Sequence, residues 1–280
     1  MDLKTIAITG ATSGVGKSLA CKLAESGCTV IIFARNESKA DKTVIDIIKQ
    51  TGNDRIEYIL CDFADRKSIL NAAEVFKNKH SRLDVLVNNA GTTVPHRELT
   101  SYGVERTFAV NHLGYFYLSY LLQDVLIKSA PSRIINVASQ AHIKIDFSNL
   151  NGEKSYDQFK AYGYSKTANI LFTYELSKRL RNRNVAVNCV HPGVVDTAIY
   201  DNVPGIMKLV IRFMSVFFLS PDKSAERIIP LILSEKYSNI TGKYFINLEE
   251  KMPKEGTYGS EDSIRLWELS NKLMNTNFLK

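Results

Sequence analysis

The first thirty-four residues place a glycine-rich turn and a helix between two short apolar runs. Residues 5–9 form an apolar run that ends at Gly10, which is typical of a buried parallel strand. Helical periodicity follows to about Ser26, and residues 29–34 form a second apolar run. Because parallel strands need a crossover connection, this order predicts a βαβ unit in a parallel sheet covered by helices.

The turn between the first strand and the helix contains three glycines, Gly10, Gly14 and Gly16. Glycine there permits a tight turn and a close approach of the backbone to a pyrophosphate, and the helix N-terminus offers free amides to phosphate. The spacing differs from the common Gly-x-Gly-x-x-Gly fingerprint, so a purely structural turn stays an alternative. Lys17 does not indicate a nucleoside-triphosphate loop, because Ala11 stands where that motif requires glycine.

Apolar strands and amphipathic helices alternate to about Phe245, and no linker, repeat or low-complexity tract divides the chain. We expect one doubly wound, Rossmann-type α/β domain over residues 1–280, with a parallel sheet of about seven strands. The net charge of +7 would permit contact with nucleic acid, but the basic residues are dispersed. Their densest cluster, residues 178–183, lies at a predicted helix C-terminus, where cations are favourable, so we expect no nucleic-acid partner.

The four cysteines, Cys21, Cys28, Cys61 and Cys189, sit in or beside predicted core elements without metal-type spacing. We expect buried free thiols and no metal site. No signal peptide precedes the first strand, so we expect a cytoplasmic protein. Peripheral contact with a membrane surface and a homodimer stay open.

Tyr162 and Lys166 are four residues apart in a helical segment and would share one helix face. A cation beside a phenol favours the phenolate and brings proton transfer into a useful pH range. A solvated tyrosine beside a surface lysine is the alternative for an isolated pair.

Six motifs in order make the chain resemble the short-chain dehydrogenase/reductase family over nearly its whole length. They are residues 9–16, Asn88-Asn89-Ala90-Gly91, Asn111, Ser139, Tyr162 with Lys166, and Pro192-Gly193. Residues 150–154 and 161–173, and the long interval between Ser139 and Tyr162, are most similar to the retinol-dehydrogenase-like branch.

The resemblance implies reversible hydride transfer between a nicotinamide dinucleotide and an alcohol or carbonyl. It implies that Tyr162 donates the proton and that Ser139 hydrogen-bonds the reacting oxygen. Lys166 would lower the pKa of Tyr162 and bond the nicotinamide ribose, and Asn111 would hold a water in the proton relay. A catalytically weak nucleotide-binding scaffold or sensor is the alternative, and an RNA-binding protein on the same fold is a more distant one.

The second strand ends at Arg35, and the next carboxylate is Glu37. An acidic residue at this position is typical of NAD enzymes, whereas arginine can pair with a 2′-phosphate. We therefore expect NADP(H) over NAD(H), with Asp62 near the adenine; a surface arginine opening a loop is the alternative. We expect the cofactor to be bound by Gly10, Thr12, Ser13, Gly14, Val15, Gly16, Arg35, Asp62, Phe63, Asn89, Ala90, Gly91, Tyr162, Lys166, Pro192, Gly193, Val195 and Thr197.

The segment 203–219 is rich in large apolar side chains, interrupted by Lys208 and Arg212. We expect a substrate lid over about residues 195–225; a core-facing helix and an interfacial membrane helix are the alternatives. Ile143, Ile145 and Phe147 could form the opposite wall. These features predict an apolar alcohol or carbonyl substrate of the lipid aldehyde, retinoid or steroid type. A C-terminal helical extension is expected over about residues 255–280.

Overall fold

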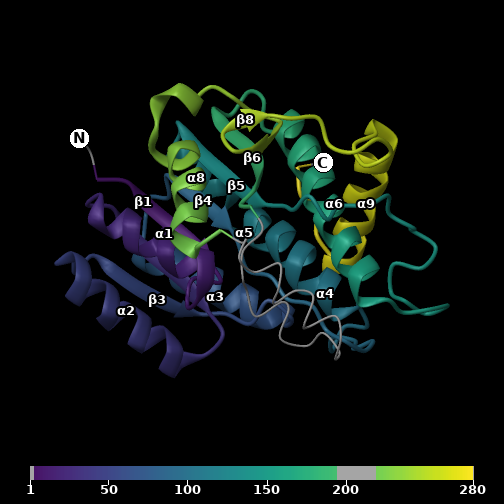
Figure 1. The fold of residues 1–280 in the computed structure, drawn as a ribbon, viewed down its shortest axis with the longest axis horizontal. Coiled ribbons are helices and arrows are strands. Elements are labelled where there is room, and N and C mark those ends of the chain that lie inside the picture. Colours follow the sequence, from purple (N-terminus) through teal and green to yellow (C-terminus); the bar gives the residue numbers. More distant parts are fainter. Residues whose placement is uncertain (1–2, 194–218, 280) are drawn as a thin grey trace.

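The protein forms a sheet of eight strands in the order β3-β2-β1-β4-β5-β6-β7-β8 (Figure 1). The structure is a computed structural model that describes residues 3–193 and 219–279. The strands are β1 Thr5–Thr9, β2 Thr29–Ala34, β3 Ile56–Leu60, β4 Val85–Asn88, β5 Ser132–Val137, β6 Val185–His191, β7 Lys243–Ile246 and β8 Glu249–Glu250. Strands β1 to β7 pair in parallel, as predicted, and the two-residue β8 adds an antiparallel edge to β7.

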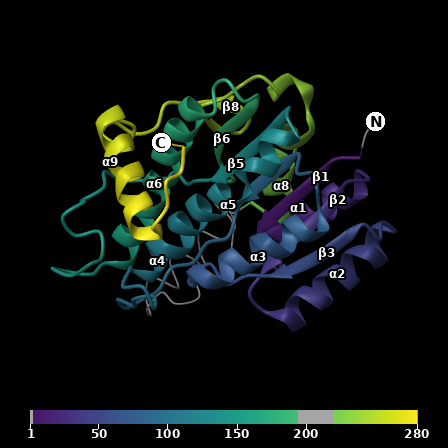
Figure 2. The same cartoon turned by 180° about the vertical axis from the view of Figure 1, so that it is seen from behind.

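Helices cover both faces of this sheet, as a doubly wound domain requires (Figures 1 and 2). The helical elements are α1 Gly14–Glu25, α2 Glu37–Thr51, α3 Arg66–Lys79, α4 Arg106–Phe108, the π-helical turn η1 Ala109–Leu113, α5 Gly114–Lys128, α6 Gln158–Arg179, α8 Pro221–Leu233, the 3-10 turn η4 Glu235–Tyr237 and α9 Ser260–Met274. The core on one face includes side chains of α1, α2 and α8, and the core on the other includes side chains of α3, α5, α6 and α9.

The central strands read as continuous apolar runs because both of their faces are buried. Ile6 and Ile8 of β1 join the core under α1 and α8, whereas Ala7 between them joins the opposite core. The same alternation continues in β2, where Ile32 and Phe33 belong to different cores and both are fully buried.

Strands β1 and β4 lie side by side in the middle of the sheet. Strands β2 and β3 continue the sheet on the β1 side, and β5 to β8 continue it on the β4 side. In open α/β sheets such a switch point leaves a crevice beyond the carboxyl ends of the strands, where ligands bind. The Gly10 turn follows β1, and Asn89 follows β4, so the two segments flank this point.

Residues 221–225, at the end of the expected lid, form the first turns of α8. Ser220 caps that helix by accepting from the Lys223 amide, and Pro221 occupies its first turn. Ser224 and Ala225 are fully buried, and α8 packs against α1. The end of the expected lid thus overlaps the start of α8, and the lid stays a prediction.

Helix α9 lies in the predicted C-terminal extension and packs along α6 (Figures 1 and 2). Trp267 of α9 meets Phe116 and Phe172 with ring centroids 5.2 and 6.0 Å apart. Aromatic burial of this kind fixes the extension against the helix that carries Tyr162 and Lys166. No helix within the described ranges is long and apolar enough to cross a membrane.

Candidate active site

The glycine turn after β1 is packed directly against the segment after β4. Gly10 has φ +67°, and a Cβ atom there would lie 2.7 Å from the Cα atom of Ala90. The Thr9 hydroxyl accepts from the amides of Asn89 and Ala90, both at 2.8 Å. The Asn89 side chain donates to the carbonyls of Thr9 and Gly10 at 2.9 and 3.1 Å. A side chain on Gly16 would also collide with the Gly10 carbonyl, so only glycine fits this close approach.

The N-terminus of α1 fits the phosphates of a dinucleotide. Ser13 stands at the N-cap position, and its side chain makes no capping hydrogen bond. The first helical bond runs from the Lys17 amide to the Ser13 carbonyl at 3.2 Å, which leaves the preceding amides to an external acceptor. The first turn carries no acidic residue that would repel an anion. Thr12 and Ser13 are both accessible at this turn.

Helix α6 places Tyr162 and Lys166 on one face, as predicted. Asp157 begins the helix by accepting from the amides of Phe159 and Lys160, both at 2.9 Å. The Lys166 ammonium lies 5.3 Å from the centre of the half-buried Tyr162 ring and 3.3 Å from the Val137 carbonyl. Lys166 is only 3 % exposed, and this burial lowers its pKa to about 8. A largely desolvated cation therefore lies beside the phenol.

Asn111 ties the π-helical turn η1 to both neighbouring segments. Its side-chain nitrogen donates to the Thr92 carbonyl and to the Ser165 hydroxyl, both at 3.0 Å, and its oxygen accepts from the Thr92 amide at 2.7 Å. The Ser165 hydroxyl in turn donates to the Tyr162 carbonyl at 2.7 Å. Short π-helical turns are frequent at functional sites. A Cβ atom on Gly91 would lie 3.7 Å from both Asn111 Oδ1 and Lys166 Nζ, so Gly91 leaves room beside the two.

Ser139 follows β5 and opens a short turn at the same edge of the sheet. Its hydroxyl oxygen accepts from the Ala141 amide at 3.1 Å, which leaves the hydroxyl proton to be donated elsewhere. Its carbonyl oxygen lies 2.6 Å from His142 Nδ1, and the amide of Gln140 donates to His191 Nδ1 at 3.4 Å. Burial lowers the pKa of His142 and lowers that of His191 to about 4, so both imidazoles are neutral near pH 7.

Sequence reasoning missed several of these supporting side chains. The Tyr115 hydroxyl donates to the Ala90 carbonyl at 2.8 Å and so supports the segment that Gly10 approaches. Ser165, His142 and His191 support Asn111 and Ser139 from positions that no periodicity or spacing distinguishes. His191 directly precedes Pro192-Gly193, and this position is the one sequence signal that could have drawn attention to it.

Three cofactor candidates lie near the ends of β2 and β3. Arg35 is exposed directly after β2. Asp62 is half-buried, and its side chain accepts from the Ala64 amide at 2.9 Å. Phe63 is 5 % exposed and packs on Gly114, where a Cβ atom would lie 2.7 Å from its ring. The Phe63 side chain is thus part of the core, and its backbone is the part left to face a ligand.

Pro192 and Gly193 follow β6 at the same edge. Gly193 has φ +100°, and the Arg227 guanidinium of α8 lies 3.2 Å from where its Cβ atom would be. Val195 and Thr197 lie outside the described residues, as do residues 203–218 of the expected lid.

The proposed opposite wall is mostly packed inward. Ile145 is 7 % exposed within the core, and Phe147 packs against the same core with the Arg265 guanidinium 4.4 Å from its ring centre. Ile143 lies against Gly163, where a Cβ atom would come within 2.8 Å of its side chain. Of the three candidates, Ile143 is the one in contact with α6 next to Tyr162, since Gly163 directly follows Tyr162.

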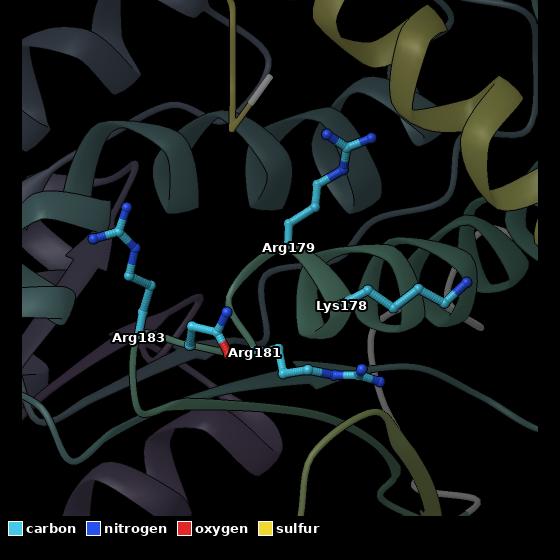
Figure 3. A pocket seen from close by; sticks show the side chains of 5 residues that line it. Lys178, Arg179, Arg181 and Arg183 are labelled. Carbon is cyan, nitrogen blue, oxygen red and sulfur yellow. The ribbon is translucent and has the colours of Figure 1, made fainter.

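The basic cluster at the end of α6 lines a cavity of about 590 Å³ (Figure 3). The cluster precedes β6, so it lies at the edge of the sheet opposite Ser139 and the Gly10 turn. Its labelled side chains fan out rather than converge. Arg179 bonds Glu175 at 2.8 Å, donates to the Leu279 carbonyl and lies over the Trp267 ring. Arg179 therefore fastens the end of α6 to the C-terminal segment, a structural role in keeping with its place at the helix C-terminus.

All four cysteines are buried free thiols, as expected. Within residues 3–193 and 219–279, no cluster of histidine, cysteine and carboxylate side chains could hold a metal ion.

The chain is similar to known proteins in both sequence and fold. The family model for short chain dehydrogenase matches residues 4–205. Retinol dehydrogenase 12 of Mus musculus is 38 % identical over 273 residues, which cover 97 % of this chain and 86 % of that protein. Retinol dehydrogenase 13 of Mus musculus is 40 % identical over 279 residues, covering 97 % and 84 %. The Pseudomonas aeruginosa RhlG/NADP active-site complex has a TM-score of 0.71 at 26 % identity, covering 86 % of this chain and 93 % of that one.

Proposed function

The chain belongs to the short-chain dehydrogenase family of oxidoreductases, and we propose that it interconverts an apolar alcohol and its aldehyde or ketone with NADP(H). The observation that carries the proposal is the buried Lys166 ammonium beside Tyr162, 5.3 Å from its ring centre, with Asn111 tied to the same helix through Ser165. A lysine with a purely structural role would not need a phenol and an asparagine beside it, whereas proton transfer to a carbonyl oxygen needs a positioned donor such as Tyr162.

When bound, the nicotinamide dinucleotide supplies or accepts the hydride. The chain would bind its phosphates with the amides of Gly14 and Val15 at the start of α1, and the ribose with Lys166. Gly91 would leave the space beside Lys166 and Asn111 that the nicotinamide end requires.

In the direction of reduction, Tyr162 would donate its phenolic proton to the substrate oxygen. The nearby Lys166 cation favours the phenolate that remains. Ser139 would donate its hydroxyl proton to the same oxygen and stabilise the negative charge that develops there, since its own oxygen already accepts from Ala141.

Asn111 would complete the proton relay through a water. Both protons of its side-chain amide are engaged by Thr92 and Ser165, so the water would be held by an oxygen of Asn111 and not by its amide protons.

Three observations support the choice of NADP(H) and of an apolar substrate. Arg35 is exposed at the end of β2, where a guanidinium can form a bidentate pair with a 2′-phosphate. Phe159, 50 % exposed, lies one turn before Tyr162 on α6 and offers an apolar surface next to it. The two mouse relatives carry the name retinol dehydrogenase, and retinol is an apolar alcohol. The covering role of residues 195–218 stays a prediction.

A chain-length series tests the substrate class. Purified protein with NADPH should reduce straight-chain aldehydes and retinal, and each added methylene should raise kcat/KM by up to about fourfold, equivalent to about 0.8 kcal/mol, until the pocket is full. NADH in place of NADPH should lower kcat/KM throughout. A flat series, or a preference for sugars or short hydroxy acids, would reject the apolar substrate. Cofactor binding without turnover on any carbonyl would favour the scaffold alternative.

A further inference from the structure

The turn that carries Ser139 is held from two sides by buried histidines. His142 lies 2.6 Å from the Ser139 carbonyl oxygen, and His191, at the end of β6, accepts from the Gln140 amide at 3.4 Å. Both side chains are nearly inaccessible, with 2 % and 5 % exposure. Ala138, one residue earlier, is fixed by a backbone bond to Val190 of β6 at 2.9 Å. The backbone hydrogen bonds between β5 and β6 thus end at Ala138, and from Ser139 onward the side chains of His142 and His191 supply the hydrogen bonds.

The hydrogen bonds of His142 determine which of its nitrogens carries the proton. The Lys254 amide donates to His142 Nε2 at 2.9 Å. A backbone amide can only donate, so Nε2 must be the unprotonated acceptor. The proton of the neutral ring therefore lies on Nδ1 and is donated to the Ser139 carbonyl. The two bonds of the ring are mutually consistent, and neither can reverse.

This ring connects distant parts of the chain. Lys254 lies between β8 and α9, 112 residues beyond His142. The His142 ring also meets the Tyr244 ring of β7 edge-on, with centroids 5.6 Å apart. A shift of the segment before α9 would therefore be transmitted to the serine turn through a single imidazole.

We propose that His142 is a positioning residue for Ser139: its Nδ1 proton fixes the Ser139 carbonyl, and with it the direction in which the serine hydroxyl points. The inference rests on the proposed function, since it assigns His142 a part in the reaction only if Ser139 acts on the substrate oxygen. The competing interpretation is that His142 only fastens the segment around Lys254 to the domain.

Two substitutions separate the interpretations because each keeps one of the two bonds. In His142→Asn the side-chain NH2 takes the place of Nδ1–H, so the donor to Ser139 survives while the Lys254 partner is lost. In His142→Gln the side-chain oxygen reaches the position of Nε2, so the Lys254 bond survives while the side-chain donor to Ser139 is lost. The carbonyl of Ser139 then keeps only the longer bond from the backbone amide of residue 142, at 3.4 Å. His142 is only 2 % exposed, so both changes are made at a buried position. His96→Asn and His96→Gln, at an exposed histidine, are matched controls.

We expect His142→Gln to lower kcat about tenfold to a hundredfold, because a displacement of about 1 Å in a positioning network can cost that much. Its KM, its NADPH Kd and its Tm should stay close to wild type. His142→Asn should keep most of kcat and lose Tm instead. A His142→Gln enzyme with wild-type kcat, or losses of kcat that follow Tm in both variants, would overturn the proposal.

Two further measurements keep this test apart from the test of the function. Ser139→Ala is assayed alongside: if it lowers kcat and His142→Gln does not, Ser139 acts and His142 does not position it. The nitrogen chemical shifts of the His142 ring are measured by NMR in the protein without substrate and should show Nδ1 protonated and Nε2 unprotonated. The opposite tautomer would reject the inference even if no carbonyl proves to be a substrate.

Discussion

Two turns at the same edge of the sheet are fixed in different ways. The glycine turn after β1 lies against the segment after β4, with Gly10 at φ +67° in contact with Ala90. Its hydrogen bonds run from the Asn89 side chain to the Gly10 carbonyl and from the Gly10 amide to the Phe33 carbonyl of β2. The serine turn after β5 is shaped by imidazoles that arrive from His191 and, through His142, from the segment at Lys254. Both turns depend on the packed domain, but the first rests on a close backbone approach that only glycine permits, whereas the second rests on imidazole hydrogen bonds. The first should fail through lost cofactor binding and the second through lost turnover.

The largest expected effect is on turnover, at Tyr162 of α6. Tyr162→Phe removes one hydroxyl from a half-buried ring and should lower kcat by roughly 10²–10⁴-fold, the usual contribution of a positioned proton donor. Folding and NADPH affinity should survive, since the proposed phosphate site at the start of α1 does not include Tyr162. Steady-state kinetics with a fluorescence titration of NADPH measure both quantities. A variant with wild-type kcat on the best substrate would remove Tyr162 from the mechanism.

A substitution in the glycine turn should lower stability and NADPH affinity, whereas Tyr162→Phe should lower kcat alone. Gly10→Ala places a methyl 2.7 Å from Ala90 Cα at a positive φ. We expect about 2–5 kcal/mol of lost stability, the sum of the left-handed strain and of overpacking, together with weaker NADPH binding. Urea unfolding and NADPH titration measure the two effects.

Gly52→Ala is the matched control for Gly10→Ala. Gly52 has φ +70°, but nothing lies within 4 Å of its Cβ position. It should lose only the strain, about 1–2 kcal/mol, with NADPH binding intact. Equal losses in the two variants would mean that the close approach of Gly10 to Ala90 contributes nothing.

Arg35 tests the cofactor choice on the same side of the molecule. Arg35→Ala should raise the NADPH Kd about tenfold to a hundredfold, because hydrogen bonds to charged groups contribute about 1.5–3 kcal/mol. Affinity for NADH and kcat at saturating NADPH should not change. Arg183→Ala, a basic residue at the opposite edge, is the control for net charge. If NADPH affinity survives the loss of Arg35, the arginine is a surface residue and the prediction of NADP(H) loses its basis.

Acid should destabilise the protein through two buried histidines, His191 beside the serine turn and His112 in η1. Burial lowers the pKa of His191 to about 4 and that of His112, which bonds Ser270 of α9 at 2.9 Å, to about 3. In the unfolded chain both titrate near pH 6.5, so the unfolded state takes up protons first and stability is lost as the pH falls below that value. The loss per histidine should reach about 2 kcal/mol at pH 5.

His112→Phe tests this dependence because its ring would sit among Phe108, Phe116 and Phe172. Urea unfolding at pH 7 and pH 5 should show a smaller acid loss in the variant than in wild type. The same pH dependence in both proteins would show that His112 is not the group responsible.

Much of this protein follows from sequence alone, because its determinants are local. The βαβ entry, the buried parallel strands and the Tyr162–Lys166 spacing rest on periodicities of a few residues, and the structure reproduces them. The free buried cysteines follow from the same patterns. The start of α8 is local as well, because the Ser220 side chain caps it and Pro221 occupies its first turn.

The tertiary structure alone decided how the site is held. Ser165 is bonded to Asn111 from 54 residues away and Lys254 to His142 from 112 residues away, and no sequence period connects such positions. The packed domain also buries Ile145 and places Phe147 against the same core, because removing apolar side chains of a loop from water is favourable. Local hydrogen bonding and periodic burial are encoded in neighbouring residues, whereas the pairing of buried polar groups exists only once the helices and strands have packed.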